Sequence, residues 1–145
     1  MMTFRTHSAS ETEAIGAQLA SLLEEDGRKN AFVALFGDMG VGKTIFCRGF
    51  CAHFGILRVK SPTYTLVNEY RSETDTVYHF DLCRLEDADE LAGIGFDEYL
   101  SEKAFKICEW SERLHSLPQG AITVHISRTD DADGREIILS TEVTL

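Results

Sequence analysis

The chain has 145 residues, 24 of them acidic and 14 basic, which gives a formal net charge of −10 and a pI near 4.9. This length suits one compact domain and leaves no room for a second. Because proteins that grip nucleic acid unaided present a basic face, the acidic balance argues against independent binding of RNA or DNA. No long apolar stretch predicts a membrane span and no apolar signal region follows the first methionine, so we expect a cytoplasmic protein.

The predicted elements alternate between helix and strand over much of the chain. Ser10 and Glu13 form a capping box before an apolar stripe of helical period, and Gly55 ends the second helical stretch. In chain order we expect a helix at 10–25, a strand at 31–36, a helix at 43–54, strands at 66–70 and 77–81, a helical stretch at 87–99 broken near Gly93 and Gly95, and strands at 104–109, 121–127 and 135–140. The order predicts a three-layer α/β domain whose mainly parallel sheet ends in an antiparallel C-terminal hairpin.

A phosphate-binding pattern occupies residues 37–44, which read G-D-M-G-V-G-K-T. It lies between an expected strand and an expected helix, the context in which backbone N–H groups surround phosphates. We expect Lys43 to contact the β- and γ-phosphates and the Thr44 hydroxyl to ligate Mg²⁺. The sequence carries no N-K-x-D signature for guanine, which leaves ATP as the expected nucleotide.

Two acidic residues, Asp81 and Glu109, each end an apolar strand pattern. In sheets of this class, ligands bind at the carboxyl ends of the parallel strands. One or two carboxylates beside the loop hydroxyl would hold a hard cation such as Mg²⁺. Each acid alone is equally consistent with a solvated strand end or a helix cap. The pair, following a phosphate loop, favours metal binding or catalysis.

Three further features leave alternatives open. The S-P-T-Y-T segment at 61–65 lies where many P-loop proteins sense the γ-phosphate, and it also fits a simple proline turn. Trp110, the only tryptophan, follows Glu109 and fits either a place near the site or ordinary packing at an edge. The cysteines lack zinc-ligand spacing, which indicates reduced thiols packed as small apolar groups. The histidines are scattered along the sequence and form no ligand cluster.

Four segments together resemble the bacterial TsaE family, also called YjeE. They are G-D-M-G-V-G-K-T, V-K-S-P-T-Y-T-L-V-N-E-Y at 59–70, Y-H-F-D-L-C-R-L at 78–85 and C-E-W at 108–110. The motifs follow the family's order, and the similarity runs from residue 8 to about residue 138. The resemblance implies a P-loop ATPase that works with TsaD and TsaB to make threonylcarbamoyladenosine beside the anticodon of transfer RNA. Its partners would hold the transfer RNA.

The resemblance also implies ATP and Mg²⁺ as cofactors and assigns residues to them. Asp81, Thr63 and Lys43 would serve catalysis, and Thr44 and Glu109 would lie at Mg²⁺. The expected nucleotide contacts are Ala9, Ser10, Gly40, Val41, Gly42, Lys43, Thr44, Ile45, Trp110 and Arg135. The chain departs from the family pattern at Ile45, Cys83 and Ser111, and the first departure removes a hydroxyl from the phosphates.

Two other functions remain open on the sequence. The first is an ATP-gated interaction module whose slow hydrolysis is incidental. The second is a small-molecule kinase, although the chain has no long insertion to serve as a substrate lid. As possible sources of a catalytic positive charge beyond Lys43, the sequence offers Arg48 and Arg84.

Overall fold

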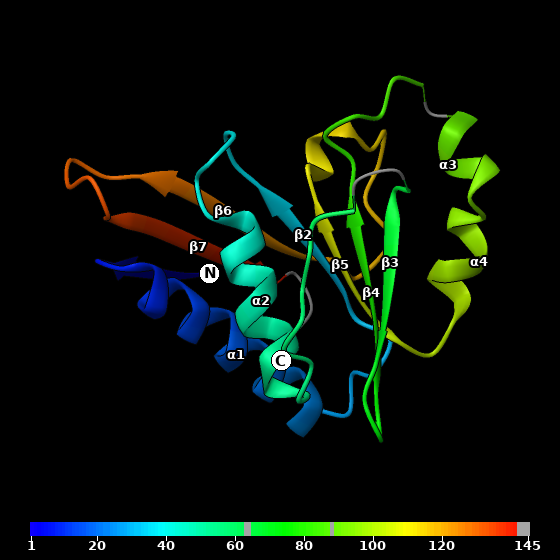
Figure 1. The fold of residues 1–145 in the computed structure, drawn as a ribbon, viewed down its shortest axis with the longest axis horizontal. Helices are drawn as coiled ribbons and strands as arrows, with labels where there is room; N and C mark the ends of the chain where they lie inside the picture. Colours follow the sequence, from blue (N-terminus) through cyan, green and yellow to red (C-terminus); the bar gives the residue numbers. More distant parts are fainter. Residues whose placement is uncertain (63–64, 88, 142–145) are drawn as a thin grey trace.

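The structure is a computed structural model that describes residues 1–62, 65–87 and 89–141 (Figure 1). It contains a seven-stranded sheet in the order β1-β7-β6-β2-β5-β4-β3. The elements in chain order are β1 (Met2–Thr6), α1 (Ala9–Glu25), β2 (Phe32–Phe36), α2 (Lys43–His53), β3 (Val67–Arg71), β4 (Thr76–Asp81), α3 (Asp89–Gly93), α4 (Phe96–Ser101), β5 (Phe105–Glu109), the 3₁₀ turn η1 (Ser111–Arg113), β6 (Ile122–Arg128) and β7 (Arg135–Thr141).

The centre of the sheet is parallel and both edges are antiparallel. Strand β2 pairs in parallel with β5 and β6, and β5 pairs in parallel with β4. Strand β3 is antiparallel to β4, while β7 is antiparallel to both β6 and β1. The mainly parallel sheet with its antiparallel C-terminal hairpin is therefore confirmed. This topology brings the carboxyl ends of β2, β4 and β5 to one edge, where such folds bind ligands.

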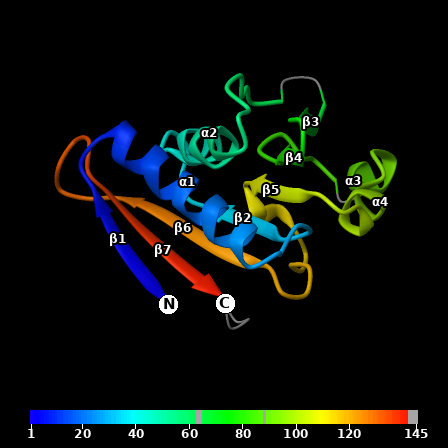
Figure 2. The ribbon, with the colours of Figure 1, turned by 90° about the horizontal axis from the view of Figure 1, so that it is seen from below.

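Helices cover the two faces of the sheet, as the view in Figure 2 shows. On one face, Phe46 and Phe50 of α2 are buried with Leu19 and Leu23 of α1 against β2, β5 and β6. On the other face, Phe96 of α4 packs edge-on against Phe32 and Phe80. Alternation along β4 divides its residues between these faces, so Tyr78 joins the second cluster.

Helices α1 and α2 approach closely enough to exclude a side chain at Gly49. A Cβ built on Gly49 would lie 1.9 Å from the backbone oxygen of Glu13. The contact fixes α1 against the helix that follows the phosphate loop. Residues near the start of α1 are therefore held beside that loop.

Several element predictions need correction. Helix α1 is capped by Ser8, whose Oγ accepts the Glu11 N–H at 3.2 Å, and not by the predicted Ser10–Glu13 pair. The helical stretch at 87–99 is two short helices, with Gly95 at a φ of 78° between them. Strand β1 was not predicted, because its alternation is weak and it is stabilised by pairing with distant β7.

None of the helices in the described ranges has the length and apolarity that a membrane span requires.

Candidate nucleotide site

The phosphate loop connects the end of β2 to the start of α2, as its sequence predicts. Gly40 and Gly42 have φ angles of 76° and 116°, in a region that side chains rarely adopt. Gly42 is the N-cap of α2, and no side chain caps its first turn. The N–H groups of that turn therefore have no side-chain cap, and such groups at a helix start favour an anion.

The Lys43 side chain is folded back over the loop and is only 4% exposed. Its ammonium group donates to the Gly37 carbonyl and, at 3.4 Å, to the Asp38 carbonyl. The same nitrogen lies 3.6 Å from the centroid of the Trp110 ring, a cation–π contact. Burial lowers the Lys43 pKa, and nearby carboxylates, first among them Glu112, oppose that shift.

The two predicted strand-end acids lie side by side. Asp81 and Glu109 are register partners in the parallel pair of β4 and β5, and they are 8% and 3% exposed. One Asp81 oxygen accepts the Cys83 N–H at 3.0 Å. One Glu109 oxygen accepts the Thr44 hydroxyl at 2.9 Å, which joins the second acid directly to the phosphate loop.

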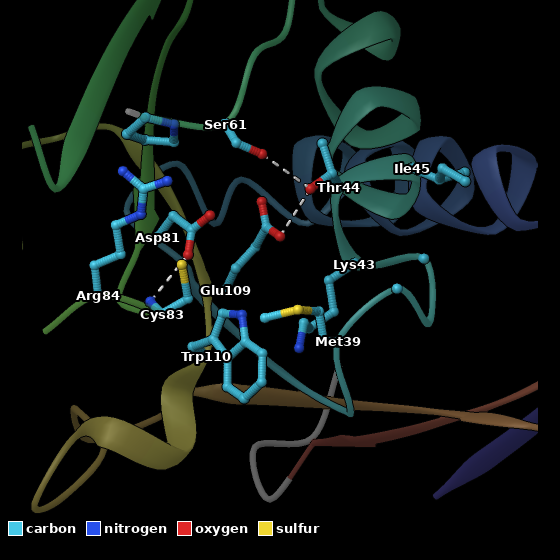
Figure 3. Close-up of a pocket in the computed structure, with 13 residues that line it drawn as sticks. Met39, Lys43, Thr44, Ile45, Ser61, Asp81, Cys83, Arg84, Glu109 and Trp110 are labelled. Carbon is cyan, nitrogen blue, oxygen red and sulfur yellow. Dashed lines mark hydrogen bonds between the residues drawn. The ribbon is translucent and has the colours of Figure 1, made fainter. Parts of the chain in front are cut away.

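These groups surround a cavity of about 400 Å³, which we call the phosphate cavity (Figure 3). Its polar lining combines the loop lysine and threonine with the two carboxylates and the Arg84 guanidinium. Its remaining lining residues are Met39, Gly40, Gly42, Ile45, Ser61, Pro62, Cys83 and Trp110. Oxygen ligands and positive charge thus converge at the carboxyl ends of three strands.

Trp110 reaches this cavity through an unusual backbone conformation. Its φ of 60° is the only positive value among the non-glycine residues that the structure describes. A bulky residue in the left-handed region costs about 1–3 kcal/mol and persists only where its surroundings enforce it. The turn directs the ring into the cavity and over Lys43. Of the two readings of Trp110, the structure therefore supports a place at the site.

A second cavity of about 160 Å³, the hairpin cavity, lies on the other side of the loop. It is bounded by the start of α1, the phosphate loop and the turn between β6 and β7. Its lining residues are Ser8, Ala9, Thr12, Gly40, Val41, Gly42, Ile45, Asp133 and Arg135. Arg135 spans the gap, because its Nε donates to the Val41 carbonyl at 2.7 Å while Nη1 donates to the Ala132 carbonyl at 3.1 Å.

Sequence comparison places the chain among known proteins. The family model described as threonylcarbamoyl adenosine biosynthesis protein TsaE matches residues 6–137. The chain belongs to the TsaE family. A tRNA threonylcarbamoyladenosine biosynthesis protein TsaE of Haemophilus influenzae is 42% identical over 84% of this chain and 78% of that protein. The protein of the same name in Bacillus subtilis is 38% identical over 94% of this chain and 83% of its own length.

The fold agrees with this assignment. A crystal structure of Bacillus subtilis YdiB superimposes with a TM-score of 0.74 and 28% sequence identity, covering 97% of this chain and 84% of that one. Three of the TsaE-like segments are the phosphate loop, β4 with the residues that follow it, and the end of β5 with Trp110. The described residues of the fourth, 59–62 and 65–70, precede β3 and form most of it, and each segment contributes residues to the lining of the phosphate cavity. They thus converge on the phosphate cavity.

The structure distributes the predicted TsaE site residues over the two cavities. Ser10 lines neither of them, and its neighbours Ser8 and Thr12 line the hairpin cavity in its place. Thr63 lies outside the described residues. Arg48 pairs with Glu13 of α1 at 3.8 Å. Of the two arginines considered for catalysis, only Arg84 lines the phosphate cavity.

Sequence reasoning missed two contacts of the phosphate loop. The Glu112 carboxylate accepts the Gly37 N–H at 3.2 Å, and Arg128 donates to the Met39 carbonyl at 2.8 Å. Glu112 follows the C-E-W segment by two residues, which is a usable signal. Arg128 comes from β6, and only the sheet order brings it to the loop.

The prediction that no histidine joins a ligand cluster is wrong. Cys47, His79 and Glu109 present ligand atoms that all lie within 4.8 Å of one another in the buried layer below the phosphate cavity. Strand alternation was the available signal for His79, because it is two residues before Asp81 and so shares its face of the sheet. Cys47 comes from the second turn of α2, which packs on that face.

Proposed function

We propose that this chain is a Mg²⁺-dependent ATPase that serves threonylcarbamoyladenosine modification of transfer RNA together with TsaB and TsaD. The observation that carries the proposal is the convergence of Lys43, Thr44, Asp81 and Glu109 on one cavity of about 400 Å³. The family is named for threonylcarbamoyladenosine biosynthesis, and this name supplies the pathway.

The side chains present fit a magnesium–triphosphate complex. The Thr44 hydroxyl and the Glu109 carboxylate are hard oxygen donors, joined at 2.9 Å, at the first turn of the helix that follows the loop. Mg²⁺ is held in nucleotide sites by one or two such protein groups together with phosphate oxygens. When bound, it would neutralise charge that develops on the phosphates.

The chain's own residues divide the remaining work. Lys43 exchanges its contacts with the Gly37 and Asp38 carbonyls for the β- and γ-phosphates, a stronger partner for an ammonium group. Asp81, held by the Cys83 N–H, orients the attacking water and accepts its proton. Arg84 adds positive charge at the same wall of the cavity.

The base would extend into the hairpin cavity, between the start of α1 and Arg135. Ala9 offers a small apolar surface there, and the flat guanidinium of Arg135 suits stacking on adenine. Gly40 and Gly42 line both cavities, so a nucleotide passing over the loop would contact both.

Two features favour a site completed by partners. Met39 lines the phosphate cavity and is 73% exposed, so it offers apolar contact area to a partner that covers the cavity. The net charge of −10 disfavours a direct grip on transfer RNA. TsaB and TsaD would therefore cover the cavity mouth and hold the transfer RNA.

Phosphate release should be measured for the purified chain alone, with TsaB, with TsaD, and with both. We expect turnover well below the about 10 s⁻¹ typical of enzymes for the chain alone, and faster hydrolysis with the pair. Fast hydrolysis that the partners leave unchanged would contradict the partner-dependent mechanism. Docking that requires ATP without faster hydrolysis would favour the interaction module, and radiolabel transfer from ATP to a metabolite would favour the kinase.

A further inference from the structure

Both oxygens of the buried Glu109 carboxylate have hydrogen-bond partners on the protein. Oε1 accepts the Thr44 hydroxyl at 2.9 Å, and Oε2 lies 2.6 Å from Nε2 of His79, which is fully buried. The Cys47 thiol approaches Oε2 at 3.8 Å. Because a carboxylate only accepts hydrogen bonds, His79 must donate through Nε2. Its Nδ1 then accepts if the ring is neutral.

That second nitrogen is met by Tyr70, whose hydroxyl lies 3.1 Å from Nδ1. The same phenol oxygen lies 3.2 Å from the Lys60 N–H, 2.9 Å from the Lys60 carbonyl oxygen and 3.3 Å from the Asn68 amide nitrogen. The Asn68 amide also donates to the Lys60 carbonyl at 2.8 Å. The single Tyr70 hydrogen can go to Nδ1 of His79 or to the Lys60 carbonyl. With a neutral His79 ring, donation to Nδ1 leaves every group paired, because the Lys60 carbonyl still accepts from Asn68 and the phenol oxygen accepts from the Lys60 N–H. Burial raises the Tyr70 pKa, which keeps this donor protonated.

The contacts form a closed ring. Lys60 is followed directly by Ser61, whose hydroxyl lies 3.2 Å from Thr44 Oγ1. Starting at Lys60, the hydrogen bonds run through Tyr70, His79, Glu109 and Thr44 and return at Ser61. The backbone at 60–61 is therefore tied to the nucleotide site at two points, once through a side chain of its own and once through the buried layer.

Sheet register explains how the ring is built. Asn68 lies opposite His79 in the antiparallel pair of β3 and β4, and Asp81 lies opposite Glu109 in the parallel pair of β4 and β5. Opposed residues share a face of a sheet, and residues two apart on a strand share it as well. Tyr70, His79 and Glu109 therefore all point to the face covered by α2, where Thr44 lies.

We propose that Tyr70 and His79 are positioning residues that fix the Glu109 carboxylate against Thr44 and tie it to the backbone at Lys60. The metal-binding oxygens and the segment leading into S-P-T-Y-T then hold one another in place. The inference rests on the proposed function, since it names the residues that orient the Mg²⁺ ligands of that same site. Groups that hold a ligand in this way commonly change metal affinity by about 10–100-fold when removed.

Tyr70→Phe tests the proposal, because it removes one hydroxyl and keeps the ring. Tyr78→Phe is the matched control, since it makes the same change nearby in the sheet but on the opposite face. His79→Gln keeps an amide donor for Glu109 and loses the acceptor for Tyr70. Calorimetry should measure ATP binding to each variant across a Mg²⁺ titration and in EDTA, and thermal unfolding should be recorded alongside.

We expect Tyr70→Phe to need about tenfold more Mg²⁺ for half-maximal ATP binding, with affinity in EDTA within about twofold of the parent. His79→Gln should behave in the same way, and Tyr78→Phe should match the parent protein. A Tyr70→Phe variant that loses thermal stability but keeps the parent's Mg²⁺ dependence would overturn the proposal, because the closed ring of hydrogen bonds would then serve folding alone.

A second measurement separates this inference from the proposed function. If the parent protein failed to bind ATP with Mg²⁺, the proposed function would fall, and the ring would be judged on the ligand-free protein. Long-range ¹⁵N NMR of the His79 ring should then show an Nε2–H tautomer, with the Nδ1 resonance shifted by Tyr70→Phe and not by Tyr78→Phe. Unchanged His79 resonances in Tyr70→Phe would show that the closed ring of hydrogen bonds through Tyr70 and His79 does not exist.

Discussion

The two cavities on either side of the phosphate loop are built in opposite ways. The phosphate cavity takes its polar groups from the ends of β4 and β5 and from the loop itself, and several of these groups are hydrogen-bonded to one another. The hairpin cavity is assembled from α1, the loop and the β6–β7 turn, and Arg135 reaches across it to backbone carbonyls. The proposed catalytic and metal-binding groups are thus positioned by strand ends, and the proposed surface for the base by the packing of α1, the loop and the β6–β7 turn.

The difference has a physical origin. A strand end in a parallel sheet is fixed by its neighbours on both sides, so the Asp81 and Glu109 carboxylates have defined positions before any ligand arrives. A hairpin turn has neighbours on fewer sides, and the contacts of Arg135 with the Val41 and Ala132 carbonyls are exchangeable. We therefore expect substitutions in the phosphate cavity to affect every polyphosphate, and substitutions in the hairpin cavity to affect only nucleotides.

The largest effect should follow Asp81→Asn, which tests the chemical half of the comparison. Asp81 orients water in the proposed mechanism, and losing a general base typically lowers a rate by about 10²–10⁴-fold. Hydrolysis in the presence of TsaB and TsaD should fall in that range, while calorimetry should find ATP affinity within about threefold of the parent. Asp97→Asn, an exposed site on α4, is the control. Equal losses of rate and affinity would instead make Asp81 a binding residue.

Lys43→Ala should weaken the binding of any polyphosphate, whether or not the ligand carries a base. Losing a charge-assisted contact costs about 1.5–3 kcal/mol, which corresponds to about 10–150-fold in affinity. Calorimetry with ATP and with inorganic tripolyphosphate, both with Mg²⁺, should show similar losses for the two ligands. The exposed Lys29→Ala variant controls for net charge. Normal tripolyphosphate binding by Lys43→Ala would place the phosphates elsewhere.

Much of the phosphate cavity was predictable from the sequence. The G-x-x-x-x-G-K-T pattern is local, and its predicted position between a strand and a helix is confirmed by β2 and α2. The acids Asp81 and Glu109 were identified because each ends an apolar strand, and parallel strands present those ends at one edge. For the same reason the α/β class and the C-terminal hairpin could be predicted from the order of the elements.

The features that the sequence did not predict depend mostly on contacts between residues far apart in the chain, which no local pattern encodes. Strand β1 is stabilised by pairing with β7, more than 100 residues away in the sequence, and its own residues are mostly exposed. The Ser8 cap was misplaced by two residues, because Ser10 and Glu13 satisfy the same pattern as Ser8 and Glu11. The ring through Tyr70 and His79 requires the register of three strands, which only the folded sheet provides.

Arg135→Ala should produce a smaller and more selective loss that sharpens the comparison. A guanidinium stacked on a base contributes about 0.5–1 kcal/mol, so we expect ATP affinity to fall about two- to fivefold. Tripolyphosphate affinity should stay at the parent value, in contrast to Lys43→Ala. Arg5→Ala, an exposed arginine on neighbouring β1, is the control. Equal losses for ATP and tripolyphosphate would show that Arg135 acts by shaping the phosphate loop.

The smallest expected effect is spectroscopic and reports on Lys43. In the structure its ammonium group lies 3.6 Å from the centroid of Trp110, the only indole in the chain. Binding of a triphosphate should draw the ammonium away from the ring and change the tryptophan fluorescence. Because phosphates alone cause the movement, tripolyphosphate should reproduce the change that ATP produces, and Arg135→Ala should retain it.

The control for this signal is Trp110→Phe, which keeps an aromatic face for Lys43 but removes the fluorophore. Its ATP affinity by calorimetry should remain within about fivefold of the parent, since phenylalanine keeps a cation–π contact and the exchange of one aromatic ring for another changes only part of the about 0.5–2 kcal/mol that such a contact is worth. An ATP-saturated parent protein with an unchanged spectrum would show that Lys43 stays on the Trp110 ring when nucleotide binds. A change produced by ATP but not by tripolyphosphate would assign the signal to the base, and the two sides of the loop would then share Trp110.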